Sequence, residues 1–107
     1  MIVTTANEVA GRPISGYLGV VRGIVVRAPT QRQINRGRTY ALLEEGNNPY
    51  FLEVVEAARE EACAEMSKHA ESLGADAVIA MRYHATPFKA GGVNEVLAYG
   101  TAVRLVP

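Results

Sequence analysis

The sequence contains few of the residues that build catalytic and metal sites. Its 107 residues include one cysteine, two histidines and no tryptophan. A single cysteine, Cys63, excludes an intrachain disulfide, so nothing indicates an oxidising compartment. The spacings CxxC, HxxxH and HExxH are absent, which argues against a zinc site formed by one chain.

The sequence also lacks a long apolar run and an excess of charge of one sign. No window approaches the ~18 apolar residues of a membrane span, and the first residues, Met1–Thr5, have no basic leader region. Eleven basic residues balance eleven acidic ones, whereas a nucleic-acid-binding domain is usually basic as a whole. We therefore expect a cytoplasmic protein that binds neither membranes nor nucleic acids.

What the sequence does contain is typical of one globular domain over residues 1–107. Hydrophobic residues make up 49% of the chain and charged residues 21%, which argues against disorder. The charges are unevenly distributed, with six arginines and no acid in residues 9–43 and nine acids in residues 44–76. The simplest interpretation is that these basic and acidic halves face each other, within a subunit or between subunits.

Three long segments predict β-strands. Tyr17–Arg27 is rich in β-branched residues, and Ala77–Thr86 and Glu95–Val106 flank a predicted hairpin loop that contains Gly91–Gly92. A shorter strand is expected at Ile2–Thr5. Both faces of Tyr17–Arg27 are largely apolar, so we expect each face to be covered.

One long helix is clearly delimited. Asn48 is its predicted N-cap, Pro49 its first residue and Gly74 the left-handed residue after its end. The segment Thr30–Glu45 is less well defined, because Gly37 lies in its middle; it is either a short, broken helix or an ordered loop. The apolar face of the long helix has three-and-four spacing and consists of Phe51, Val54, Val55, Ala58, Ala62, Met66, Ala70 and Leu73.

These elements predict an α+β fold in which an antiparallel sheet packs on one long helix. A hairpin after the helix places the last strand between the other two long strands, which gives a split β-α-β core. Ala98, Gly100 and Ala102 share one face of the last strand. We expect the long helix to pack on these small residues.

Several motifs resemble those of the YbjQ-like family, small bacterial proteins labelled as heavy-metal-binding. In order, they are MIVTT at residues 1–5, YLGVV at 17–21, LGADAVI at 73–79, GG at 91–92 and YGTAV at 99–103. Residues 28–48 depart from the family, which usually has a longer amphipathic segment there that ends in a glycine-rich turn. The resemblance implies a compact α+β subunit of a ring-shaped homopentamer, in agreement with the two apolar faces of Tyr17–Arg27.

The metal label requires ligands, and the candidates are Cys63, His69 and His84. At about 100° per residue, Cys63 and His69 lie roughly 120° apart around the helix, so one helix face cannot present both. Ordinary roles account for them: Cys63 as a small half-buried residue and His69 as a solvated residue near the helix C-terminus. We predict no metal or other cofactor bound by one chain; the alternative is a site whose ligands come from several subunits.

No set of residues indicates an enzyme. His84 could serve as a general base, but no acid or nucleophile can be paired with it. Cys63 lies in the middle of a helix and lacks the N-terminal setting that activates a thiol. Catalysis is therefore not expected.

The arginines suggest an anionic ligand instead. Repetition of one chain around a ring would concentrate positive potential, and the candidate anion-binding residues are Arg22, Arg27, Arg36 and Arg38. We predict a non-enzymatic, homo-oligomeric binding module, most simply a pentamer, with an unknown ligand. The alternative function is heavy-metal binding by ligands shared between subunits.

Overall fold

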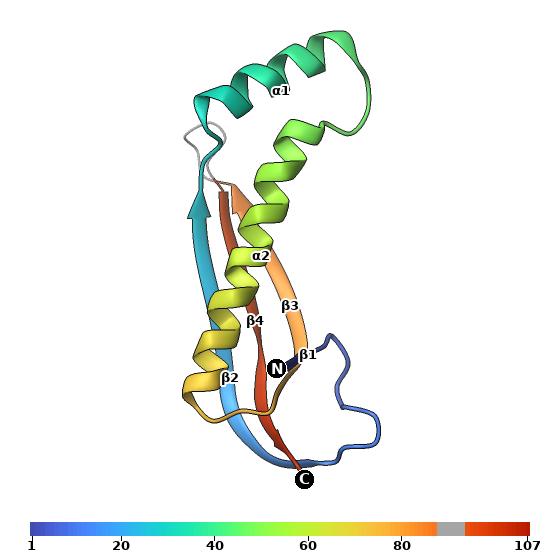
Figure 1. The fold of residues 1–107 in the computed structure, drawn as a ribbon, viewed down its shortest axis with the longest axis vertical. Helices are drawn as coiled ribbons and strands as arrows, with labels where there is room; N and C mark the ends of the chain where they lie inside the picture. Colours follow the sequence, from blue (N-terminus) through green and yellow to red (C-terminus); the bar gives the residue numbers. More distant parts are fainter. Residues whose placement is uncertain (88–93) are drawn as a thin grey trace.

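The computed structural model describes residues 1–87 and 94–107, and it contains four strands and two helices (Figure 1). The predicted Gly91–Gly92 loop lies outside the described residues. In chain order, the elements are β1 (Ile2–Val3), β2 (Ile14–Arg27), α1 (Gln31–Leu43), α2 (Pro49–Ser72), β3 (Ala77–Pro87) and β4 (Asn94–Leu105).

The strands form one sheet in the order β1-β3-β4-β2. β4 lies between β2 and β3 and is antiparallel to both, as the sequence predicted. The predicted α+β fold with its split β-α-β core is thus confirmed. The sheet is not wholly antiparallel, however, because the short β1 pairs in parallel with β3.

Helix α2 packs across one face of the sheet and forms the core with it (Figure 1). Phe51 and Leu73, at the two ends of its predicted apolar face, remain 37% and 40% exposed. The residues buried between helix and sheet are Val54, Ala58, Ala62, Met66 and Ala70 from α2, and Val21, Val25, Val96, Ala98 and Ala102 from the strands.

The ends of α2 form as the sequence predicted. The Asn48 side chain caps the first turn. At the other end Gly74 has φ of 77°, and the N–H groups of Gly74 and Ala75 donate to the carbonyls of Glu71 and Ala70. These two bonds are those of a Schellman motif, in which glycine is favoured because it adopts the left-handed conformation without strain.

Gly100 lies on the helix-facing side of β4, as expected, because it pairs with the buried Val21, but the described glycine that contacts the helix backbone is Gly23 of β2. A Cβ atom on Gly23 would collide with the backbone of Ala62 and Met66. Gly100 lies beside a β-bulge in β3, where Ala80 and Met81 together oppose it. Ala80 has φ of 52°. Its N–H donates to the Ala6 carbonyl, so the N-terminal segment accepts a hydrogen bond from a backbone N–H group of the bulge.

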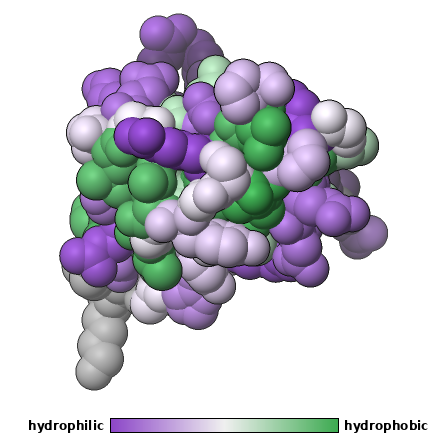
Figure 2. Space-filling model, turned by 90° about the horizontal axis from the view of Figure 1, so that it is seen from below, coloured by the Kyte–Doolittle hydropathy of each residue, from purple (hydrophilic) through white to green (hydrophobic). Residues whose placement is uncertain are grey.

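The other face of the sheet is covered near the termini, where Val9 and Ile14 pack on the buried Ala77, Ile79, Val103 and Leu105, but it is exposed along β2. Val20 and Val26 of the edge strand β2 are 72% and 60% exposed on it. In the view from the end that carries both termini, hydrophobic residues form two surface groups separated by paler and hydrophilic residues (Figure 2). Neither helix of the described chain is long and apolar enough to cross a membrane.

Candidate ligand-binding pocket at the helix junction

Helix α1 is continuous, which settles the alternatives left open for residues 30–45. Thr30 and Gln33 form a reciprocal capping box: the Thr30 hydroxyl accepts from the Gln33 N–H at 3.2 Å, and the Gln33 side-chain oxygen accepts from the Thr30 N–H at 2.9 Å. Gly37 does not break the helix. It is buried against the ring of Phe51, at a distance that leaves no room for a Cβ atom.

Asn48 joins the two helices. Its side-chain oxygen accepts from the N–H groups of Tyr50 and Phe51 at the start of α2, at 3.2 and 3.4 Å. Its side-chain nitrogen donates to the Gly37 carbonyl of α1 at 2.8 Å. One residue therefore both caps α2 and fixes the position of α1 relative to it.

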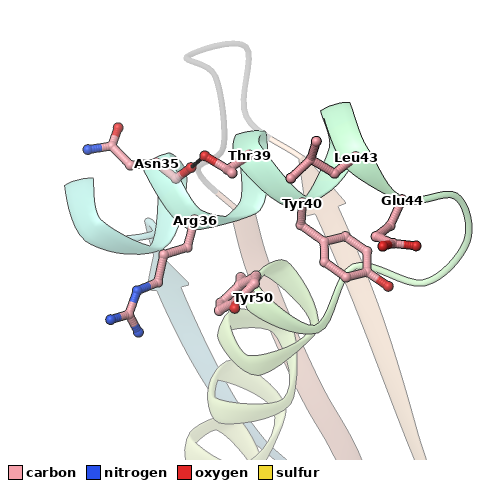
Figure 3. A pocket seen from close by; sticks show the side chains of 7 residues that line it. All are labelled: Asn35, Arg36, Thr39, Tyr40, Leu43, Glu44 and Tyr50. Carbon is pink, nitrogen blue, oxygen red and sulfur yellow. Dashed lines mark hydrogen bonds between the residues drawn. The ribbon is translucent and has the colours of Figure 1, made fainter.

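An open pocket of about 460 Å³ lies in the angle between the helices (Figure 3). Arg36 lies toward one end and Glu44 toward the other, with the ring of Tyr50 between them (Figure 3). Tyr40 and Tyr50 make an edge-to-face contact with centroids 6.2 Å apart. The lining residues are Asn35, Arg36, Thr39, Tyr40, Leu43, Glu44 and Tyr50. The volume falls within the range of ordinary small-molecule pockets.

The four predicted anion-binding arginines do not meet in one chain. Arg22 and Arg27 are exposed on β2, and Arg27 forms an ion pair with Glu61 of α2. Arg36 and Arg38 are exposed on α1, and only Arg36 lines the pocket. Of the four, Arg36 is therefore the one that stands in a concave, aromatic-lined setting.

The three candidate metal ligands lie in separate places. The ring of His69 faces the edge strand, where its Nδ1 accepts from the backbone N–H of Arg22 at 3.3 Å. Cys63 is a half-buried residue of α2, and His84 is exposed on β3. Among the residues that the structure describes, no group of three or more His, Cys, Asp and Glu side chains is placed to hold a metal ion.

Cys63 belongs to a cluster that the sequence did not indicate. It lies near Tyr83 of β3, and the Arg59 guanidinium lies 5.8 Å from the centroid of the Tyr83 ring. Burial, followed by the neighbouring Cys63, raises the pKa of Tyr83. The only sequence signal was the spacing of Arg59 and Cys63, which places both on one side of α2.

Replacing Tyr83 by Phe should remove the phenol that titrates late in the folded protein. Because the raised pKa favours the neutral phenol, its contribution to stability is present below pH ~10 and is lost as the pH rises through the folded-state value. Ultraviolet titration of tyrosinate checks this. Tyr17→Phe, at a side chain 71% exposed, is the control and should leave the late phase in place; a late phase that persists in Tyr83→Phe would contradict the assignment.

The fold and the pocket define a small α+β protein without a recognisable catalytic constellation in its described residues. The family model described as "Putative heavy-metal-binding", YbjQ_1, matches residues 1–106. The chain belongs to this family, as the sequence motifs predicted.

Similar proteins support the same assignment. A UPF0145 protein of Chromobacterium violaceum is 49% identical over 106 residues, which cover 99% of this chain and 89% of that protein. One from Legionella pneumophila is 46% identical over 103 residues, 96% of each chain. The crystal structure of a DUF74-family protein of unknown function from Pediococcus pentosaceus matches with a TM-score of 0.67 at 20% identity, over 99% of this chain and 98% of that one, and shows the same fold.

Proposed function

We propose that this protein is a non-enzymatic, homo-oligomeric binding module that binds a small anionic ligand in the pocket between α1 and α2. The observation that supports it is the position of Arg36 in an open pocket of about 460 Å³ beside two tyrosines. A guanidinium binds carboxylate or phosphate oxygens with paired hydrogen bonds. Tyrosine rings add apolar contact area and hydroxyl groups for orientation.

Self-association is supported by the open edge of the sheet and by the part of its second face that is exposed along β2. β2 has 14 residues and forms an open edge, and such edges are a liability unless another chain covers them. The exposed Val20, Ile24 and Val26 lie along this strand. We infer a cytoplasmic ring-shaped homopentamer, in which five copies of the pocket would add their positive potential.

A non-enzymatic role is supported by the separation of the reactive side chains. His84 is exposed on β3, and Cys63 is half-buried on α2. General base catalysis requires the base within hydrogen-bond reach of the group it activates. The described neighbours of the Cys63 thiol are Tyr83 and, beside it, Arg59, and not His84.

The test is a calorimetric titration of the protein with inorganic phosphate and with a polyphosphate. We expect salt-sensitive binding by wild type, weakened about tenfold or more in Arg36→Ala, since a hydrogen bond to a charged group contributes ~1.5–3 kcal/mol. Arg38→Ala, on the same helix but outside the pocket, is the matched control and should bind as wild type does. Absence of binding by wild type would remove the anion hypothesis.

Heavy-metal binding by ligands shared between subunits is the second candidate, and the family description favours it. Because Cys63, His69 and His84 lie apart in one chain, such a site would have to be completed by symmetry. We expect untagged, purified protein to contain no stoichiometric zinc or copper. One tightly bound metal per subunit, lost when all three residues are replaced by Ala, would establish this second candidate instead.

A further inference from the structure

Helix α1 presents an outer face that no described residue of its own chain covers. The helix lies beyond the end of the sheet and packs on the first turns of α2 (Figure 1). Its buried side contains Gly37. On the outer side, Leu42 and Leu43 are 86% and 76% exposed, so the last turn of α1 directs two adjacent leucines into solvent.

The same outer face is basic. α1 contains Arg32, Arg36 and Arg38 and no acidic residue, and all three arginines are exposed. At about 100° per residue, Arg32, Arg38 and the two leucines fall on the half of the helix opposite Gly37. We call these four residues the α1 face; of them Leu43 also lines the pocket, as does Arg36 at the margin of the face.

Helix α2 carries the complementary surface. Glu53, Glu56 and Glu60 follow each other at intervals of three and four residues, so they form one line along the helix. All three are exposed, and they lie opposite the buried Val54 and Ala58. We call these three glutamates the α2 stripe.

The two surfaces do not meet within one chain. The ion pairs found among the described residues are Arg27 with Glu61 and Lys68 with Glu65, and neither involves the α1 face or the α2 stripe. α1 already contacts α2 through its Gly37 side, which directs the α1 face away. The described residues of the chain therefore offer no charged partner for the α1 face.

We propose that the α1 face docks on the α2 stripe of a second copy of this chain. The second copy is the occupant that the charges favour, because each chain carries one basic and one acidic surface and its net charge is zero. The two surfaces differ, so the contact is head-to-tail and generates a closed ring if the rotation between copies closes. This inference rests on the homo-oligomer of the proposed function and names the surfaces that form it.

A charge exchange tests the contact with the full chain. One variant reverses the α1 face (Arg32→Glu and Arg38→Glu), a second reverses the α2 stripe (Glu53→Arg and Glu60→Arg), and a third combines all four changes. Arg36 is kept, so the pocket is unchanged. The readout is the mass by sedimentation equilibrium, with circular dichroism to confirm that each variant is folded.

We expect each two-residue variant to self-associate at least tenfold more weakly than wild type, because like charges then face each other. The four-residue variant should regain the wild-type mass, since the complementarity is restored in the opposite sense. Glu8→Arg with Glu71→Arg, two exposed acids outside the stripe, is the matched control and should not change the mass.

The outcomes separate this inference from the proposed function. An oligomeric wild type whose mass survives both reversals would overturn the α1–α2 contact and leave the oligomer intact. A monomeric wild type would overturn both. If the α1 reversal abolished binding to anionic lipid vesicles or to RNA without changing the mass, the α1 face would serve that other partner, and the proposed contact would be refuted.

Discussion

Replacing Gly23 by alanine is expected to destabilise the fold by about 3 kcal/mol, the upper part of the usual range for overpacking. The added Cβ would collide with the Ala62 carbonyl and the Met66 nitrogen of α2. Both atoms belong to the helix backbone, which cannot rotate away as a flexible side chain would. The helix would have to rise from the sheet, and Met66 and Ala62, which are fully buried, would lose part of their contacts.

Denaturant unfolding monitored by circular dichroism measures this loss. Gly16→Ala is the matched control, because Gly16 lies on the same strand and a Cβ there meets nothing within 4 Å. The control should change stability by less than 1 kcal/mol, in line with other substitutions away from packed features. Equal stability of Gly23→Ala and the control would show that α2 does not approach β2 as closely as described.

Replacing Gly100 by leucine is expected to cost roughly 2 kcal/mol through overpacking. A Cβ at this position would lie 2.6 Å from Val78 Cγ1 and 3.0 Å from the Ile79 carbonyl oxygen. Its neighbours are therefore the bulged strand β3, and the bulge itself is held by hydrogen bonds to the N-terminal segment. We expect the substitution to loosen this segment as well as to lower the unfolding midpoint.

Hydrogen exchange and thermal unfolding together check this expectation. Thr101→Leu is the control, since Thr101 is the next residue of β4 and lies on the face of the sheet away from α2. Gly100→Leu should expose the amides of Ala80 and Met81, which donate to the Ala6 and Thr4 carbonyls. A lower unfolding midpoint without faster hydrogen exchange at these two amides would show that the leucine side chain does not disturb the β3 bulge.

Much of the fold could be predicted because its signals are local. Asn48 and Pro49 mark the start of α2, Gly74 marks its end, and the structure confirms each. The strand order followed from connection rules, since a hairpin after the crossover leaves one economical position for β4.

The packing of the glycines could not be predicted, because it depends on register. Two bulges in β2 and one in β3 shift which residues share a face. The alternation of β4 keeps Gly100 on the helix side, opposite Val21, but the bulge of β3 at Ile79–Arg82 lies beside it, and the close approach to the α2 backbone falls on Gly23.

The candidate pocket was only partly visible in the sequence. Its charge made Arg36 a candidate anion-binding residue. Its position in the pocket, away from Arg22, depends on the angle between α1 and the rest of the chain. That angle is set by the contact of Gly37 with Phe51 and by the hydrogen bond from Asn48. Gly37 suggested a break in the helix, whereas in the folded chain it permits the close approach of two helices.

The central claim is that several chains associate. The proposed concentration of positive charge, the covering of the β2 edge and the contact of α1 with α2 of a second copy all require this association. The most direct measurement is the mass of the full, untagged chain by multi-angle light scattering after size exclusion at micromolar concentration. Our account predicts a single species with five times the 11.5 kDa mass of one chain. A species with the mass of one chain would contradict it.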